Sequence, residues 1–168
     1  MTASPWVRRF APLVTPGGAV LDVACGSGRH ARLFLERGHP VTAIDRDIAA
    51  TDAPGAELIQ ADLEDGSPWP VEGRSFAAIV VTNYLWRPLL PRIVASLAPG
   101  GVLIYETFAQ GNERFGSPRN PNFLLARGEL LRVAEGLTVV AYEDGIENGC
   151  RVVQRVCAVR GEGPVTLS

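Results

Sequence analysis

The sequence contains no lysine, because all 16 of its basic residues are arginine. This absence excludes P-loop nucleotide hydrolysis, which needs a phosphate-binding lysine, and it also excludes Schiff-base catalysis through lysine. Cysteine is scarce as well, and the three cysteines, at positions 25, 150 and 157, form no disulfide framework. A chain with so few cysteines is expected in the reducing cytoplasm.

The sequence also lacks any apolar run of about 18 residues, so no membrane span is expected. The first residues, MTASPWVRRFAPLV, have neither a continuous apolar segment nor a small-residue cleavage site, which argues against a signal peptide. The net charge of −2 favours no nucleic-acid partner. With 168 residues, of which 46% are hydrophobic, residues 1–168 are expected to form a single globular domain.

Short apolar runs alternate with helical segments along most of the chain, which is typical of a parallel sheet covered by helices. The predicted strands cover residues 19–24, 40–45, 56–62, 75–83 and 101–108. The predicted helices cover residues 28–37, 88–97 and 128–136, and a short crossover helix is expected in 46–55. Residues 109–126 are rich in Gly, Pro and Asn and predict a long loop.

Two consecutive strands, LTVVAYEDGI and CRVVQRVCAVRG, follow the last predicted helix and are joined by a turn at ENG. Consecutive strands joined by a turn pair antiparallel, whereas ordinary dinucleotide domains end with a parallel strand. The predicted fold class is therefore α/β: a doubly wound, Rossmann-like, seven-stranded sheet in three layers, with an antiparallel last strand.

The stretch AVLDVACGSGRHARLF (residues 19–34) places small residues where the first strand turns into a helix. Gly26 and Gly28 let a ligand approach the backbone, and the helix behind them offers unpaired N–H groups to an anion. Asp22 carries the charge opposite to an ammonium group. The same stretch satisfies both a dinucleotide fingerprint and the acid-then-glycine loop of an S-adenosylmethionine (SAM) site.

Polar side chains end the next three strands. Asp45, which lies 19 residues after Gly26, is suited to accept hydrogen bonds from both ribose hydroxyls. In a SAM site, Asp62 would accept from the adenine amino group while Leu63 packs on the ring. The cofactor site is completed by residues that neighbour these positions along the chain, namely Ala24, Cys25, Arg46, Ala61, Thr82 and Asn83.

Four motifs in order, VLDVACGSGRHA, VTAIDRD, IQADLEDG and LAPGGVLIYETF, resemble those of class I SAM-dependent methyltransferases. More narrowly, NYLWRPLLPRI followed by YETFAQGNERFGSPRNPNFLL is similar to small bacterial tellurite-resistance-like (TehB-like) methyltransferases. The resemblance covers nearly the whole chain. It implies SAM as cofactor, methyl transfer as activity and a small-molecule acceptor, including soft or anionic nucleophiles.

Three features depart from the pattern of the family. Ala24 stands where many members have Gly, and Ala77 stands where the fourth strand often carries Asp. The segment before the first strand is short, so the acceptor side is either open or completed by a partner subunit. A monomer and a homodimer are both compatible with the sequence.

The acceptor is expected to bind at residues 84–127. This stretch contains five arginines, two glutamates and several aromatic residues. Glu106, at the end of the fifth strand, is the first choice for a general base, and Asn83 and Tyr84 would orient the acceptor. The loop 109–122 is predicted to close as a lid that brings Arg114 or Arg119 to an acceptor anion.

Three alternatives stay open at this point. The same glycine loop could serve an NAD-dependent oxidoreductase, or the domain could bind SAM without catalysis. An RNA methyltransferase is the third, because basic and aromatic residues are interleaved in the acceptor stretch. No metal site is expected, since His30 and His39 form no cluster with the cysteines.

Overall fold

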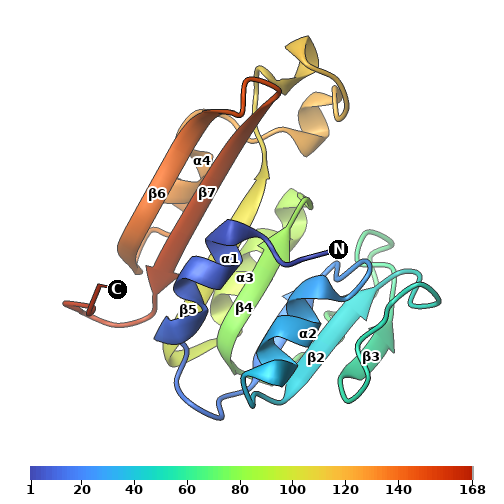
Figure 1. The fold of residues 1–168 in the computed structure, drawn as a ribbon, viewed down its shortest axis with the longest axis vertical. Coiled ribbons are helices and arrows are strands. Elements are labelled where there is room, and N and C mark those ends of the chain that lie inside the picture. The colour runs from blue at the N-terminus through green and yellow to red at the C-terminus, as the bar shows by residue number, and fades with distance from the viewer. Residues whose placement is uncertain (168) are drawn as a thin grey trace.

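In the computed structural model, which describes residues 1–167, seven strands form one sheet in the order β3-β2-β1-β4-β5-β7-β6 (Figure 1). The five parallel strands are β1 (Val20–Val23), β2 (Val41–Asp45), β3 (Glu57–Gln60), β4 (Phe76–Thr82) and β5 (Leu97–Phe108). Strand β7 (Arg151–Val159) runs antiparallel between β5 and β6 (Thr138–Glu147). The predicted doubly wound sheet with an antiparallel last strand is confirmed.

Helices cover both faces of the sheet, which gives the three expected layers (Figure 1). On one face, α1 (Pro5–Phe10) and α2 (Arg29–Glu36) bury Trp6, Val7 and Phe34 against the central strands. On the other face, α3 (Leu90–Ala95) and α4 (Glu129–Val133) bury Ile93 and Leu130. Single 3-10 turns lie at Ala11–Leu13, Arg87–Leu89, Asn112–Arg114 and Pro121–Phe123.

The crossover helix expected between β2 and β3 is absent from the described residues, so that prediction was wrong. Two aspartates turn the chain there instead: the Asp45 carboxylate accepts from the Asp47 N–H, and the Asp47 carboxylate accepts from the Ala49 N–H. Aspartate side chains that bond the backbone two residues on favour turns over helix. The predicted helix over 88–97 is also shorter, because its start is a 3-10 turn and β5 already begins at Leu97.

This topology brings the carboxyl ends of β1 to β5 to one edge of the sheet, where ligands of open α/β sheets bind. The connection from β5 to α4 crosses the same edge and is tied down by Asn112. The Asn112 side chain accepts from the Val152 N–H at 3.0 Å and donates to the Pro118 carbonyl at 3.1 Å. None of the helices within residues 1–167 is long and apolar enough to cross a membrane.

Candidate active site

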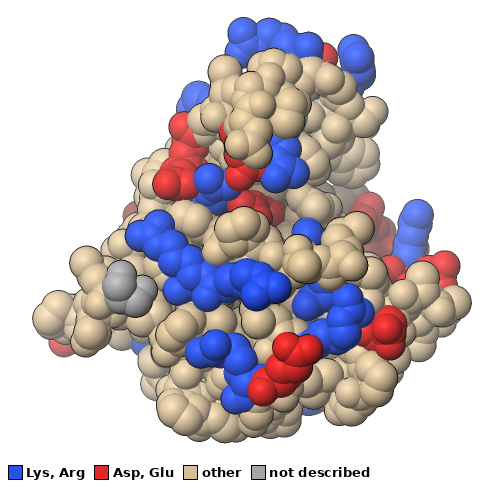
Figure 2. Space-filling view, viewed as in Figure 1, with Lys and Arg blue, Asp and Glu red and all other residues tan. Residues whose placement is uncertain are grey.

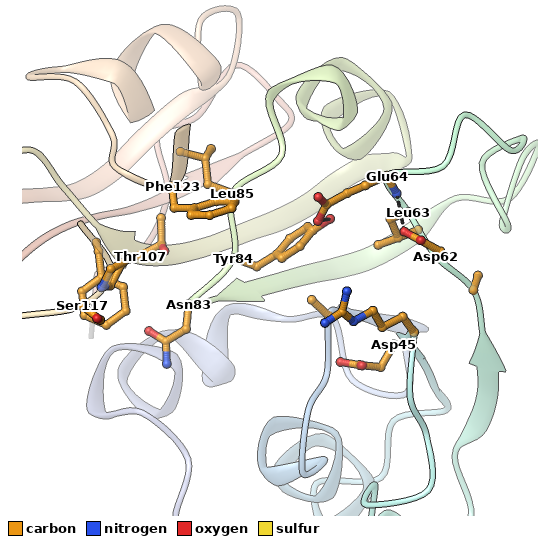
Figure 3. Close-up of a pocket in the computed structure, with 15 residues that line it drawn as sticks. Asp45, Asp62, Leu63, Glu64, Asn83, Tyr84, Leu85, Thr107, Ser117 and Phe123 are labelled. Carbon is orange, nitrogen blue, oxygen red and sulfur yellow. Dashed lines mark hydrogen bonds between the residues drawn. The ribbon is translucent and has the colours of Figure 1, made fainter. Parts of the chain in front are cut away.

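A cavity of about 670 Å³ opens at the carboxyl ends of the parallel strands (Figure 3). Its walls come from the ends of β1 to β5 and from the loop after β5. The lining residues are Ala24, Asp45, Arg46, Ala61, Asp62, Leu63, Glu64, Asn83, Tyr84, Leu85, Thr107, Phe108, Ser117, Pro118 and Phe123. Eight of these fifteen residues carry polar or charged side chains, and the volume is in the range of small-molecule sites.

The Asp45 carboxylate is held at the rim of the cavity by two backbone donors. Its Oδ2 accepts from the Gly26 N–H at 2.9 Å, and its Oδ1 accepts from the Asp47 N–H at 3.1 Å. A carboxylate has about four lone-pair positions, so each oxygen retains one for a further donor. Asp45 therefore presents two fixed acceptors, which is the arrangement that two ribose hydroxyls require.

The loop after β1 has a backbone that favours glycine. Gly26 has a φ of +53° and Gly28 a φ of +84°, and Ala24 adopts the same left-handed region at +55°. A Cβ on Gly28 would lie 3.2 Å from the Cβ of Ala53. The loop is therefore closely packed at Gly28, and the backbone rather than side chains shapes this end of the cavity.

Cys25 lies in this loop but faces inward. Its thiol is buried beside Thr51, and burial raises the pKa of the thiol to about 11, so it remains protonated near neutral pH. Its backbone N–H donates to the Ile44 carbonyl at 2.9 Å and prolongs the pairing of β1 with β2. Cys25 therefore has a structural role, because its buried side chain and its backbone hydrogen bond hold the loop against β2.

Asp22 is buried in β1, with 1% of its surface exposed. Its Oδ2 has no hydrogen-bond partner among the described residues. Burial raises the pKa of this carboxyl to about 7, while a backbone hydrogen bond from Ala31 and the charge of Arg29 lower it in part. A buried acceptor left unpaired at the start of α2 fits a cationic or hydrogen-bonding ligand at the glycine loop.

A tyrosine that follows β4 and a glutamate that follows β3 form one side of the cavity. The Tyr84 hydroxyl donates to Oε2 of Glu64 at 3.0 Å, and Figure 3 shows Tyr84 extending from the end of β4 toward Glu64. Burial, with the Glu64 bond second, raises the pKa of Tyr84, so the side chain stays a phenol. At the same rim, Oδ1 of Asp62 accepts a hydrogen bond from the Glu64 N–H at 2.9 Å, which fixes the orientation of the Asp62 side chain.

Glu106 faces away from this cavity, toward α1. Its Oε1 accepts from the Ser4 hydroxyl at 2.6 Å, and its Oε2 forms an ion pair with Arg155 at 3.0 Å. Asn83, with a φ of +53°, donates its backbone N–H to the Glu106 carbonyl at 2.9 Å. Asn83 lines both the first cavity and a second one that contains Glu106.

His30 and Thr82 form a buried chain behind the site. The Ser4 N–H donates to Nε2 of His30 at 3.1 Å, and Nδ1 of His30 lies 3.4 Å from the Thr82 hydroxyl. Burial lowers the pKa of His30 to about 3, so the ring is neutral, and it fastens the N-terminal segment to the sheet. This buried role of His30 has no signal in the sequence.

The cavity brings together eight of the residues predicted from sequence: Ala24, Asp45, Arg46, Ala61, Asp62, Leu63, Asn83 and Tyr84. Seven others do not line it, namely Asp22, Cys25, Gly26, Gly28, Thr82, Glu106 and Arg119. Sequence reasoning missed Glu64 and Thr107. Glu64 had a signal, because it follows Asp62 at the same strand end.

The arginines of the predicted acceptor stretch are mostly engaged elsewhere. Arg87 binds Glu129 through two nitrogens, at 2.8 and 2.9 Å, while Arg92 pairs with Glu72 and Arg127 with Asp144. Three of the five arginines are thus paired within the protein, and neither Arg114 nor Arg119, the two expected at an acceptor anion, is among them. Of the aromatic residues in this stretch, Tyr84, Phe108 and Phe123 line the cavity.

The strand order and the ligand-binding edge define the class I methyltransferase fold. The structure of TehB from Haemophilus influenzae superposes with a TM-score of 0.74 at 17% identity, covering 95% of this chain and 63% of that one. A 1,6-didemethyltoxoflavin-N1-methyltransferase from Burkholderia thailandensis, with bound 1,6-didemethyltoxoflavin and S-adenosylhomocysteine, gives a TM-score of 0.66 at 20% identity and covers 94% and 77%.

Residues 20–101 match the family model described as a methyltransferase domain. A trans-aconitate 2-methyltransferase from Paracidovorax citrulli is 36% identical over 95 residues, which are 50% of this chain and 36% of that protein. The chain spans 36–41% of the length of such curated relatives. Residues 20–101, just under half of the chain, therefore match a methyltransferase domain, and the chain adopts the fold of the TehB structure, as the motifs predict.

Proposed function

We propose that this protein transfers a methyl group from SAM to a small-molecule acceptor. The observation that carries the proposal is the Asp45 carboxylate, which two backbone N–H groups fix at the rim of a 670 Å³ cavity that also contains Asp62 and Asn83. In an NAD site no acid is required at the position of Asp62. The methyltransferase domain of residues 20–101 covers the strand ends that carry all three residues.

The residues of the cavity divide into a cofactor end and an acceptor end. Asp45 would accept from the ribose hydroxyls, and Asp62 from the adenine amino group, with Leu63 and Arg46 against the ring. Asp22, with its unpaired buried oxygen, and the backbone of Gly26 and Gly28 would hold the methionine-like part. Ala24, Cys25, Ala61 and Thr82 are proposed to shape this end.

The cofactor supplies an activated methyl group, so this chain's residues contribute mainly by orientation and by excluding water. Asn83 and Tyr84, at the end of β4, are proposed to orient the acceptor. Glu106 remains the proposed general base for acceptors that need one, and Arg155 holds its side chain in place at 3.0 Å. Arg119 is proposed to reach the acceptor through closure of the loop 109–122.

The names of proteins with related sequence or fold include trans-aconitate and 1,6-didemethyltoxoflavin, which are both small molecules, and this supports an acceptor of that size. We further propose that residues 1–168 act as one domain, as a monomer or a homodimer, in the cytoplasm. The three free cysteines among the described residues support a reducing compartment.

The test is binding of S-adenosylhomocysteine to the purified protein. Ligand at about 100 times its dissociation constant adds about 2.7 kcal/mol of stability, which raises the melting temperature of a domain of this size by roughly 5–10 °C. NAD at the same concentration serves as the control and is expected to have no effect. A shift with NAD alone would contradict the proposal, and a shift without methyl transfer to any acceptor would favour a binding module.

A further inference from the structure

A second cavity, of about 490 Å³, lies beside the first and shares Asn83 with it. One wall comes from the N-terminal segment and α1, and the opposite wall from the ends of β5, β6 and β7. Trp6 holds the first wall rigidly: its indole N–H donates to the Val156 carbonyl at 3.2 Å, and the Arg155 guanidinium lies 5.4 Å from the ring centroid. The cavity is therefore a preformed site next to the proposed position of the acceptor.

The three glutamates of this cavity form ion pairs with two arginines. Arg155 contacts Glu106 at 3.0 Å, Glu143 at 2.6 Å and Glu147 at 2.7 Å. Arg151 forms a second, close ion pair with Glu147. These five side chains together carry a charge of −1, and the cavity as a whole becomes positive only through its other arginines.

Two further arginines line the same cavity without such a partner. Within residues 1–167, neither Arg9 nor Arg29 lies within ion-pair distance of a carboxylate. The Arg9 guanidinium stacks 4.7 Å from the ring centroid of Phe10, and Arg29 donates to the Thr2 carbonyl at 3.2 Å. Figure 2 shows blue side chains gathered over the face that α1 and α2 form in Figure 1.

We propose that Arg9 and Arg29 bind a carboxylate of the methyl acceptor, so that the acceptor belongs to the small carboxylic acids. The uncompensated charge in this cavity is positive, and guanidinium groups bind carboxylates through charge-assisted hydrogen bonds. A carboxylate held there leaves the rest of the molecule to extend past Asn83 toward the first cavity. This inference rests on the proposed function, because it places the anion next to a SAM site.

The test measures anion binding to protein saturated with S-adenosylhomocysteine, by calorimetry. The probes are malonate and trans-aconitate, and the uncharged trimethyl ester of trans-aconitate is the ligand control. Arg9→Gln and Arg29→Gln are each expected to weaken binding of at least one probe by about tenfold or more, which is the loss of one charge-assisted hydrogen bond. Arg8→Gln, the same change on the same helix but outside the cavity, should alter binding less than about twofold.

Several results would overturn the inference. The first is that the ester binds as tightly as trans-aconitate. The second is that neither acid binds at 20 mM, and the third is that Arg9→Gln and Arg8→Gln weaken binding equally. Competition between the acids and S-adenosylhomocysteine would assign the arginines to the cofactor instead. Failure of the proposed function looks different, because S-adenosylhomocysteine itself would then not bind, while acid binding could still be measured without it. Melting temperatures confirm that each variant is folded.

Discussion

The backbone N–H of Gly26 donates a hydrogen bond of 2.9 Å to the Asp45 carboxylate, linking the loop after β1 to the end of β2. The same carboxylate is the proposed acceptor for the ribose hydroxyls. Because it also accepts from the Asp47 N–H, it organises the rim of the cavity before any ligand binds. Ligand binding and local stability are therefore coupled at Asp45.

Replacing Asp45 with Ala should weaken S-adenosylhomocysteine binding by at least about 100-fold, because two charge-assisted hydrogen bonds of about 1.5–3 kcal/mol each are lost. The melting temperature should also fall by several degrees, since the Gly26 and Asp47 donors lose their acceptor. Calorimetry and thermal unfolding measure the two effects. Asp47→Ala is the control, because within residues 1–167 that carboxylate bonds only the Ala49 N–H and does not line the cavity. The affinity of Asp47→Ala for S-adenosylhomocysteine should change less than about threefold. An Asp45→Ala protein with normal affinity would show that the ribose binds elsewhere.

The raised pKa of Asp22 predicts a pH-dependent stability. An acid whose pKa is raised to about 7 in the folded state binds its proton more tightly there than in the unfolded chain, where the value is 3.8. The folded state then carries more protons between these values, so the free energy of unfolding falls as pH rises from about 4 to about 7. Asp22→Asn removes this pH-dependent decrease in the free energy of unfolding, because the amide does not titrate. The variant should gain stability relative to the wild type across that window, by a few kcal/mol at most.

Urea unfolding at pH 5, 6, 7 and 8 measures this difference. Asp65→Asn is the control, because hydrogen bonds from Ser67 lower the pKa of that exposed carboxyl, so its contribution changes only at lower pH. A constant difference between Asp22→Asn and the wild type from pH 5 to 8 would contradict a buried, proton-binding Asp22.

Two substitutions in the loop after β1 should act in opposite directions. Ala24 has a φ of +55°, where a Cβ costs about 1–2 kcal/mol, so Ala24→Gly should hold or raise the melting temperature. Gly28→Ala should lower it, because the new Cβ meets Ala53, the Asp52 carbonyl and Thr51 at 3.2 Å in addition to the strain of φ +84°. Thermal unfolding of both variants measures this contrast, and a more stable Gly28→Ala protein would contradict the close packing of the loop.

The proposed lid role of the loop 109–122 predicts a kinetic effect at Arg119, which is exposed. Arg119→Ala should lower turnover or raise the acceptor KM, while S-adenosylhomocysteine affinity changes less than about threefold. Because the amides of Ala109 to Asn112 are hydrogen-bonded, the exchange that is fast in the free protein and slower with both ligands is expected over residues 117–122. Arg92→Ala, which breaks an exposed ion pair with Glu72, is the control and should not affect turnover. Normal turnover of Arg119→Ala, with exchange that ignores both ligands, would make the segment a plain surface loop.

The sequence by itself determined the sheet and the strand ends that line the cavity. Strand ends could be read from the local pattern, because three of the apolar runs stop at a polar residue, namely Asp45, Asp62 and Asn83. The rule that ligands bind at the carboxyl ends of parallel strands then placed these residues on one edge without knowledge of any contact. The missing helix between β2 and β3 is the local exception, since aspartate-capped turns outweighed the expected crossover.

Only the tertiary structure decided how the charged side chains are paired. Ser4 meets Glu106 across 102 residues of chain, and Arg155 meets Glu106 across 49. Such pairs depend on how α1 and β7 pack against β5, and no local pattern encodes them. The same packing engages Arg87 within the protein and leaves Arg9 and Arg29 without carboxylate partners among residues 1–167. The sequence supplies the number of arginines, but long-range packing decides which of them are available to a ligand.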